Sequence, residues 1–222
     1  MNIITFSGWG SPADSLNAIV PKMPQLQNWS WGFFEQASSH QFTVSEDTHL
    51  VAYSMGSLKA LEFAATYSNK VKSLTLISGF SQFTYSPRPK VEMLQQKKLT
   101  RMIDAFQLNQ EAVYDQFHLN SSFPCEPSSS TNFSNAKQTA LKDGLDLLQT
   151  ESSNKYLSDI TCPVFLLRGD KDKIVSSEHN HYLASQLKNC TVLNIEKHGH
   201  ALPFTAPKVV QQEITRFIEE NS

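Results

Sequence analysis

Hydrophobic positions along the chain fall into short runs of branched residues that alternate with amphipathic stretches. Each run is apolar over most of its length, which is typical of a strand covered on both faces in a parallel sheet. The alternation therefore predicts an α/β protein with a mainly parallel sheet of about six strands. The pattern places five of these strands, at residues 2–6, 48–53, 73–78, 162–168 and, more weakly, 191–195.

Helical spacing predicts a helix directly after the second strand and another at the end of the chain. In residues 57–67 the apolar side chains recur every three or four positions without an intervening Gly or Pro. Residues 207–220 show one apolar face, and Pro207 suits the first turn of a helix. The chain is therefore expected to pass from strand through a sharp turn into a helix, and to end in a surface helix.

The middle of the chain follows a different rhythm. Helical stretches at residues 91–106, 111–119 and 135–149 succeed one another without a strand between them. We therefore predict an α/β core made of residues 1–79 and 155–222, with residues 80–154 inserted as a helical cap. The alternative is that these helices belong to one continuous fold.

Composition narrows the class of protein. The 222 residues are 40% hydrophobic, which suits one compact domain with a genuine core. The formal net charge is -2, so the chain lacks the basic field that would hold nucleic acid. No apolar run approaches the roughly 18 residues of a membrane helix, and the first residues do not resemble a signal peptide. We expect a cytoplasmic monomer that binds neither nucleic acid nor membrane.

Cysteine usage adds one exclusion. Cys125, Cys162 and Cys190 are odd in number and widely spaced. They therefore favour ordinary reduced thiols over a disulfide framework or a metal knuckle.

The sharpest motif is Ala-Tyr-Ser-Met-Gly at residues 52–56, between a predicted strand and a predicted helix. It resembles the nucleophile elbow of the α/β-hydrolases, Gly-x-Ser-x-Gly, with Ala in the first position. A serine turned outward at such a tight bend adopts strained backbone angles, so the residues two before and two after it must be small. Ala52 and Gly56 meet this need, and Ser54 is the candidate nucleophile.

A serine hydroxyl needs a base and an orienting acid, and matching positions for both follow later in the chain. Residues 169–175 resemble the family's Gly-x-x-Asp-x-x-Val loop, in which Asp172 is the matching acid. Asp170 is the alternative, and we expect it to shape the turn. The family's Gly-His pattern then selects His200 as the base. Ser54, Asp172 and His200, the predicted triad, follow the α/β-hydrolase chain order.

The other histidines are expected to be surface or hydrogen-bonded residues; they are His40, His49, His118, His179, His181 and His198. His179 and His181 with Glu178 leave a metal site as an alternative, but a third spaced ligand is missing. The predicted chemistry needs no metal and no cofactor.

The tetrahedral intermediate of acyl transfer needs two backbone N–H donors, known together as an oxyanion hole. Met55 follows the nucleophile and supplies the first donor in this family. The turn at residues 7–10 resembles the family's His-Gly-x-x turn, which implies Trp9 as the second. Ser7 stands where the family has His.

Several short sequence segments, taken together, resemble those of a narrower family, the pimeloyl-[acyl-carrier protein] methyl ester esterases of biotin synthesis. Besides the elbow, they are residues 8–10, 77–80, 141–148 and 199–204. The resemblance implies a carboxylic ester hydrolase in which Ser54 attacks the ester, His200 transfers the proton and Asp172 orients the imidazole. Methanol would leave first, and water would then free the serine.

The resemblance also implies a substrate channel and a partner. Phe80, Phe83 and Phe117 lie near the expected acyl channel, and Phe117 matches a Phe of the family's cap that contacts the acyl chain, although composition alone favours a core residue at each position. The partner would be acidic acyl-carrier protein bearing a pimeloyl methyl ester, for which Lys97, Lys98 and Arg101 form a candidate docking cluster. The alternative is a solvated helix face, since residues 80–150 carry seven basic and seven acidic side chains.

Two other functions remain open from the sequence. One is a broad-specificity small acyl esterase or thioesterase, which would share every catalytic residue. The other is a non-catalytic binding protein with an α/β-hydrolase fold. Retention of all three triad residues in order favours an enzyme.

Overall fold

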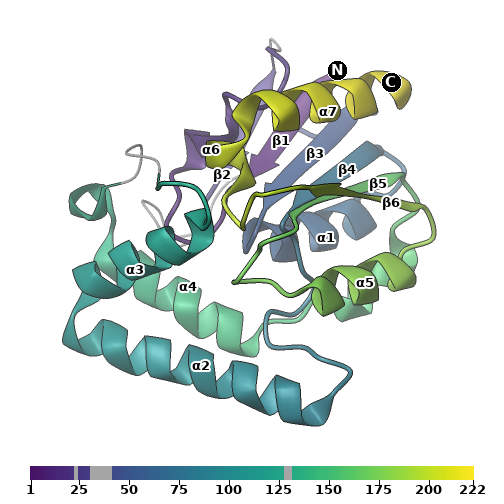
Figure 1. Ribbon diagram of the computed structural model, residues 1–222. Coiled ribbons are helices and arrows are strands. Elements are labelled where there is room, and N and C mark those ends of the chain that lie inside the picture. Colours follow the sequence, from purple (N-terminus) through teal and green to yellow (C-terminus); the bar gives the residue numbers. More distant parts are fainter. Residues whose placement is uncertain (23–24, 31–41, 128–131) are drawn as a thin grey trace.

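A six-stranded parallel sheet forms the centre of the structure, a computed structural model that describes residues 1–22, 25–30, 42–127 and 132–222 (Figure 1). The strands lie in the order β2-β1-β3-β4-β5-β6, and each neighbouring pair is parallel. The predicted α/β class is confirmed. The strands are β1 (Asn2–Phe6), β2 (Leu26–Trp29), β3 (Thr48–Tyr53), β4 (Val71–Ile77), β5 (Val164–Gly169) and β6 (Cys190–Ile195).

The five strands placed from the sequence are all present, with ends that differ from the prediction by two residues at most. Strand β2 has no counterpart in the prediction because it lacks a branched apolar run. It lies at the sheet edge, where its side chains hydrogen-bond to β1. Gln27 donates to Asn2 (3.1 Å), and Asn28 accepts from Thr5 (2.7 Å). Because these side chains are polar, the strand lacks the continuous apolar run by which buried strands are recognised in a sequence.

Helices cover both faces of the sheet, because successive strand residues point to opposite sides. On one face Ala60 and Leu61 pack with Phe6, and on the other Val210 and Ile214 pack beneath β1 and β3. The first face is covered by α1 (Gly56–Thr66) and α5 (Ser177–Gln186), and the second by α7 (Pro207–Glu220), α6 (Leu202–Thr205) and the short helix η1 (Ala13–Leu16). The helices predicted at residues 57–67 and 207–220 are confirmed as α1 and α7.

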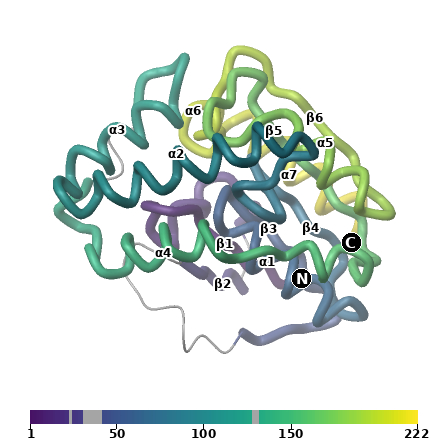
Figure 2. The backbone as a smooth tube through the Cα atoms, turned by 90° about the horizontal axis from the view of Figure 1, so that it is seen from below, coloured from purple at the N-terminus to yellow at the C-terminus, as the bar shows by residue number. Residues whose placement is uncertain are grey.

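The helices between β4 and β5 gather at one end of the sheet, as both views show (Figure 1, Figure 2). Their apolar residues, among them Phe106 and Leu141, pack with Trp9 and Phe80 from loops that follow β1 and β4. They therefore cover the carboxyl ends of the strands. These helices are α2 (Pro89–Leu108), α3 (Gln110–Ser122) and α4 (Gln138–Thr150), with the short helix η2 (Phe133–Asn135) beside α3. The short helix η3 (Asn154–Asp159) packs against α1 instead.

The prediction of a helix from residue 135 is wrong by three residues at its start. The side chain of Asn132 accepts a hydrogen bond from the Ser134 N–H (3.0 Å) and so caps the start of a separate short helix, η2, which ends at the extended Ala136. Side chains of this type compete with helical hydrogen bonds and favour such caps. Among the residues that the structure describes, no helix is both long and apolar enough to cross a bilayer.

Candidate active site

Ser54 lies at the sharp turn between β3 and α1, in the left-handed backbone region with φ 51°. Its N–H donates to the Ile77 carbonyl (2.9 Å), which ties the turn to β4. A Cβ atom at Gly56 would overlap the carbonyl oxygen of Phe6, so no larger residue fits there. Ala52 is fully buried against neighbouring strands. These are the steric conditions that the sequence motif predicts for an outward-facing serine.

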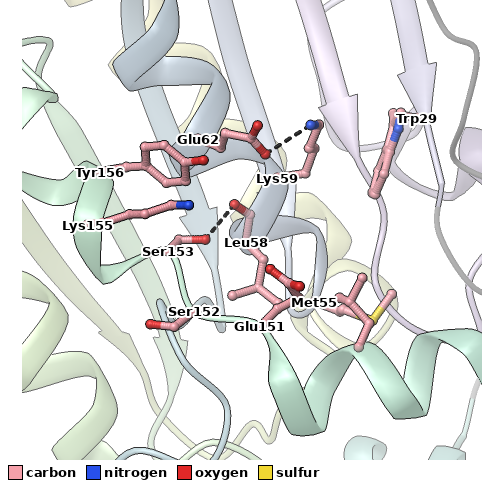
Figure 3. Close-up of a pocket in the computed structure, with 11 residues that line it drawn as sticks. Trp29, Met55, Leu58, Lys59, Glu62, Glu151, Ser152, Ser153, Lys155 and Tyr156 are labelled. Atoms are coloured by element: carbon pink, nitrogen blue, oxygen red, sulfur yellow. Dashed lines mark hydrogen bonds and ion pairs between the residues drawn. The ribbon is translucent and has the colours of Figure 1, made fainter.

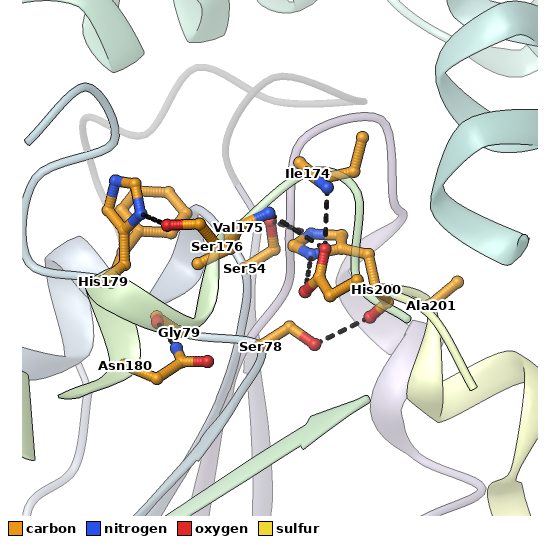
Figure 4. Close-up of polar contacts among 12 residues, drawn as sticks. Ser54, Ser78, Gly79, Ile174, Val175, Ser176, His179, Asn180, His200 and Ala201 are labelled. Atoms are coloured by element: carbon orange, nitrogen blue, oxygen red, sulfur yellow. Dashed lines mark hydrogen bonds and ion pairs between the residues drawn. The ribbon is translucent and has the colours of Figure 1, made fainter. Parts of the chain in front are cut away.

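Ser54, His200 and Asp172 form one continuous hydrogen-bonded chain. Figure 4 shows Ser54 and His200 within it. His200 Nε2 lies 2.8 Å from Ser54 Oγ, and His200 Nδ1 lies 2.9 Å from Asp172 Oδ2. A carboxylate can only accept, so Nδ1 carries the proton and Nε2 is left to accept from the serine hydroxyl. The side chains of His200 and Asp172 are both fully buried. The arrangement can take a proton from Ser54.

Asp172 is fixed by its own loop. Its Oδ1 accepts hydrogen bonds from the N–H groups of Ile174 (2.8 Å) and Val175 (2.9 Å), which leaves Oδ2 for His200. The alternative acid, Asp170, faces elsewhere and accepts from the Lys197 N–H (2.7 Å). A hydrogen bond from Lys171 lowers the pKa of Asp170. The structure therefore brings Asp172, and not Asp170, to the imidazole.

Two further residues, Ser78 and Tyr53, contact His200. The hydroxyl of Ser78 donates to the His200 carbonyl (2.9 Å) and links the end of β4 to the His200 loop. The Tyr53 ring lies 5.4 Å from the imidazole, centroid to centroid. Burial and the charge of Asp172 both raise the pKa of Tyr53, so this phenol stays protonated and cannot compete as a base.

Serine hydroxyls near the elbow form contacts that no local motif indicates. Ser57 Oγ lies 2.6 Å from the Ser54 carbonyl and accepts from the Phe80 N–H (3.0 Å). Ser7, which replaces the family's histidine, donates to the Trp29 carbonyl (3.1 Å). The sequence at residues 77–80 resembles that of the family. This resemblance does not indicate which contacts Ser78 and Ser57 make. Their roles depend on partners distant in sequence.

The two predicted oxyanion donors belong to chain segments that lie close to Ser54. Met55 is its chain neighbour, and a Cβ atom on Gly8, which precedes Trp9, would lie 3.1 Å from Ser54 Cβ. Within the described part of the chain, neither backbone N–H has a hydrogen-bond acceptor. The Trp9 indole donates to the Leu141 carbonyl of α4 (2.8 Å), which fixes the turn. Both donors can therefore serve an oxygen that develops negative charge.

The predicted substrate residues separate into two groups. Phe83 and Phe117 line a cavity of about 340 Å³ beside Asp172. The Phe117 ring lies 6.5 Å from the His200 ring and 4.9 Å from the Trp9 ring, between centroids. Phe80 is 1% exposed and does not line this cavity, but its ring contacts that of Phe83 (5.2 Å). Phe80 therefore lies in the core behind the cavity wall.

The predicted docking cluster also divides. Lys97, Lys98 and Arg101 all lie on α2 and are exposed, but Lys98 lines the cavity beside Asp172. Lys97 and Arg101 are absent from that lining and belong to the outer surface of the helix. The three positions are thus not equivalent.

Of the histidines weighed against His200, His179 is held by two other partners, while His40 lies outside the described residues. His179 Nε2 donates to the Phe83 carbonyl (2.8 Å), so its Nδ1 accepts from the Ser176 hydroxyl (2.9 Å). Burial lowers the pKa of His179, which keeps the ring neutral. Because both of its nitrogens are engaged, His179 is unsuited to bind metal. Within the described ranges, no group of three His, Cys, Asp or Glu side chains is arranged to hold a metal ion.

A separate cavity of about 250 Å³ lies between α1 and the chain that follows α4 (Figure 3). Its walls carry charges of both signs, including the ion pair of Lys59 and Glu62 (2.9 Å) and the side chain of Lys155. Met55 reaches its wall, but none of the triad residues does. The cavity beside Asp172 has one triad residue, Asp172, on its wall together with Phe83 and Phe117, so it is the better candidate for substrate, although Ser54 and His200 do not line it.

Comparison with known families decides the wider identity. A family described as having the alpha/beta hydrolase fold matches residues 43–207. The chain belongs to this alpha/beta hydrolase family. An esterase from Exiguobacterium antarcticum has the same fold, with a TM-score of 0.83, 12% sequence identity, and coverage of 99% of this chain and 92% of that one.

Some proteins with similar sequences are named for an enzymatic activity. A pimeloyl-[acyl-carrier protein] methyl ester esterase of Neisseria meningitidis serogroup A is 26% identical over 89% of this chain and 70% of its own length. One from Aromatoleum aromaticum is 24% identical over 91% of this chain and 92% of its own. Together with the family match, these relatives identify this alpha/beta hydrolase as a carboxylic ester hydrolase, as the sequence predicts.

Proposed function

We propose that this hydrolase cleaves the methyl ester of pimeloyl-[acyl-carrier protein] in biotin synthesis, with Ser54, His200 and Asp172 as its triad. The catalytic part rests on the buried hydrogen-bonded chain from Ser54 Oγ through His200 to Asp172. The substrate part rests on relatives named for this reaction, which match 89% and 91% of the chain.

Acylation begins when Ser54 Oγ attacks the ester carbonyl carbon while its proton moves to His200 Nε2. The carbonyl oxygen becomes negative and accepts hydrogen bonds from the N–H groups of Trp9 and Met55. Asp172 keeps its bond to Nδ1 and stabilises the imidazolium. The intermediate then collapses, the bond to the methoxy oxygen breaks, and His200 returns the proton so that methanol leaves.

Deacylation repeats these steps with water as the nucleophile. His200 Nε2 takes a proton from water as the water oxygen attacks the acyl carbon, and the same two N–H groups stabilise the oxyanion. Collapse breaks the bond to Ser54 Oγ, which receives the proton back. The net reaction converts one ester and one water into one carboxylic acid and one methanol, with no cofactor.

The covering helices supply the substrate site in this proposal. Residues 80–154 form the cap, over a core of residues 1–79 and 155–222. Phe83 and Phe117 contact the acyl chain in the cavity beside Asp172, and Phe80 stabilises this wall from behind. Cytoplasmic location and the monomeric state remain predictions from the sequence.

Carrier docking gives a prediction about α2. Because acyl-carrier protein is acidic, Lys97→Glu with Arg101→Glu is expected to raise the KM for the carrier-bound ester by roughly five- to tenfold at low salt, and less at high salt. Hydrolysis of p-nitrophenyl acetate should not change. Lys98 is left intact because it lines the cavity. Steady-state kinetics on both substrates measures the effect.

A matched control is Lys208→Glu with Arg216→Glu, which also reverses two positive charges, on the exposed side of α7. It should leave both substrates unaffected. Equal loss on the carrier-bound and small esters in the α2 variant would show that this face does not dock the carrier.

The proposed pathway is tested by complementation of a biotin auxotroph that lacks its own methyl esterase. The wild-type chain is expected to restore growth without biotin, and Ser54→Ala, expressed at the same level, is not. Hydrolysis of small esters by a chain that fails to restore growth would instead indicate the small acyl esterase. Absence of any hydrolysis by folded protein would favour the non-catalytic binding protein.

A further inference from the structure

One short cap segment contacts the loops that carry both the base and the acid of the proposed triad. It comprises residues 121–125, which are the last two residues of α3 and the three residues directly after it. The proposed mechanism assigns these residues no role. Their contacts are made to the immediate chain neighbours of His200 and Asp172.

Both neighbours of His200 lie against backbone carbonyls of this segment. The Ala201 N–H donates to the Ser121 carbonyl (2.9 Å). On the other side, a Cβ atom on Gly199 would overlap the carbonyl oxygen of Phe123, so the two backbones are in close contact there. The position of the imidazole thus depends on where residues 121–123 lie.

The neighbour of Asp172 contacts the same segment. The ammonium of Lys173 lies 3.1 Å from the centre of the Phe123 ring, a cation–π contact. One residue before Gly199, His198 Nδ1 lies 3.5 Å from the thiol of Cys125. The segment therefore links the acid loop to the base loop through the cap.

The proposed site is closed in this arrangement. Ser54 is 5% exposed and His200 is fully buried. Phe117, also on α3, packs its ring edge against Trp9, whose N–H is a proposed oxyanion donor. An ester can reach Ser54 Oγ only if the covering residues move, and a displacement of α3 would also pull on residues 121–125.

We propose that residues 121–125 position His200, so that the imidazole reaches Ser54 fully only when α3 is packed against the core. The inference rests on the proposed triad and adds a coupling between cap and base. Substrate enters with the cap displaced, and return of α3 restores both the oxyanion turn and the base. Ser121 and Phe123 are positioning residues, since they act through the loops and touch no reacting atom.

The test measures how fast a small organophosphonate labels Ser54, because this rate depends on the base and not on carrier docking. Phe123→Gly removes the ring from Lys173 and loosens the backbone after α3. Ala201→Pro removes the N–H donor, and its φ of -81° is close to that of proline. Each is expected to lower the labelling rate and the kcat for a small ester by about 10- to 100-fold, with KM changed by less than about twofold.

Conservative substitutions at the same two positions, together with a control substitution elsewhere in the cap, separate the positioning role from general loosening of the cap. Phe123→Tyr keeps an aromatic face and Ala201→Ser keeps the N–H, so both should retain most of the wild-type rate. Leu108→Gly alters the 88% exposed last residue of α2, which contacts neither triad loop, and should label normally. Thermal unfolding identifies folded variants; if Ala201→Pro does not fold, the Phe123 pair decides.

Folded Phe123→Gly that labels at the wild-type rate would overturn the positioning role. A fall of the same size in Leu108→Gly would overturn it too, because loosening anywhere in the cap would then suffice. Failure of the wild-type chain itself to be labelled would instead remove the proposed triad, so the two failures are distinguishable.

Discussion

Ser54→Ala is expected to lower kcat for ester hydrolysis by about 10,000-fold or more and to abolish labelling by an organophosphonate. No other hydroxyl takes its place, because His200 Nε2 is directed at Ser54 Oγ (2.8 Å). The residual rate should reflect only binding and the oxyanion donors. Steady-state kinetics and mass spectrometry of the treated protein measure both effects.

Ser54→Gly provides a control that separates chemistry from folding. Ser54 has φ 51°, which costs an L-residue roughly 1–2 kcal/mol and costs glycine almost nothing. The glycine variant should therefore be as inactive as the alanine variant but more stable to unfolding by about 1 kcal/mol. Substantial activity in either folded variant would contradict the assignment of the nucleophile.

Asp172→Asn is expected to lower kcat by about 10,000-fold, while KM for a small ester changes little. The Ile174 and Val175 N–H groups would hold the carbonyl oxygen of the amide, so its NH₂ would face His200 Nδ1. Two donors cannot share that contact, and the imidazole would carry its proton on Nε2 instead. In that tautomer it cannot accept the proton of Ser54. Kinetics at several pH values measures the loss.

Asp170→Asn is the matched control, with the same chemical change two residues earlier. Asp170 contacts the Lys197 N–H and the Lys171 ammonium, but not the imidazole. We expect its kcat to stay within about threefold of the wild type, since the change affects only a surface turn. A larger loss for Asp170→Asn than for Asp172→Asn would transfer the orienting role to Asp170.

The sequence determined most of the sheet because buried strands are local features. An apolar run such as that at residues 48–53 must be covered on both faces wherever it lies, so its sequence alone predicts its state. Strand β2 depends instead on the hydrogen bonds of Gln27 and Asn28 to β1, and no local pattern reveals them. The start of α4 was placed three residues early for a similar reason, since Asn132 caps a separate short helix that ends at the extended Ala136.

The candidate triad could also be predicted from the sequence, because each of its residues lies in a motif with its own steric requirements. Small residues around Ser54 and glycine before His200 reflect backbones that approach too closely for a Cβ atom. The small residues that meet these steric requirements lie within a few positions of each triad residue in the sequence. Their order along the chain was enough to expect that they converge.

Only the tertiary structure decided which side chains near the triad touch it. Phe80 lies behind the cavity wall while Phe83 and Phe117 line the cavity, although composition treats the three alike. Lys98 faces that cavity and Lys97 does not, because adjacent residues on a helix point in different directions. Contacts between residues 121–125 and the His200 loop join positions about 80 apart, and packing alone brings such distant backbones together.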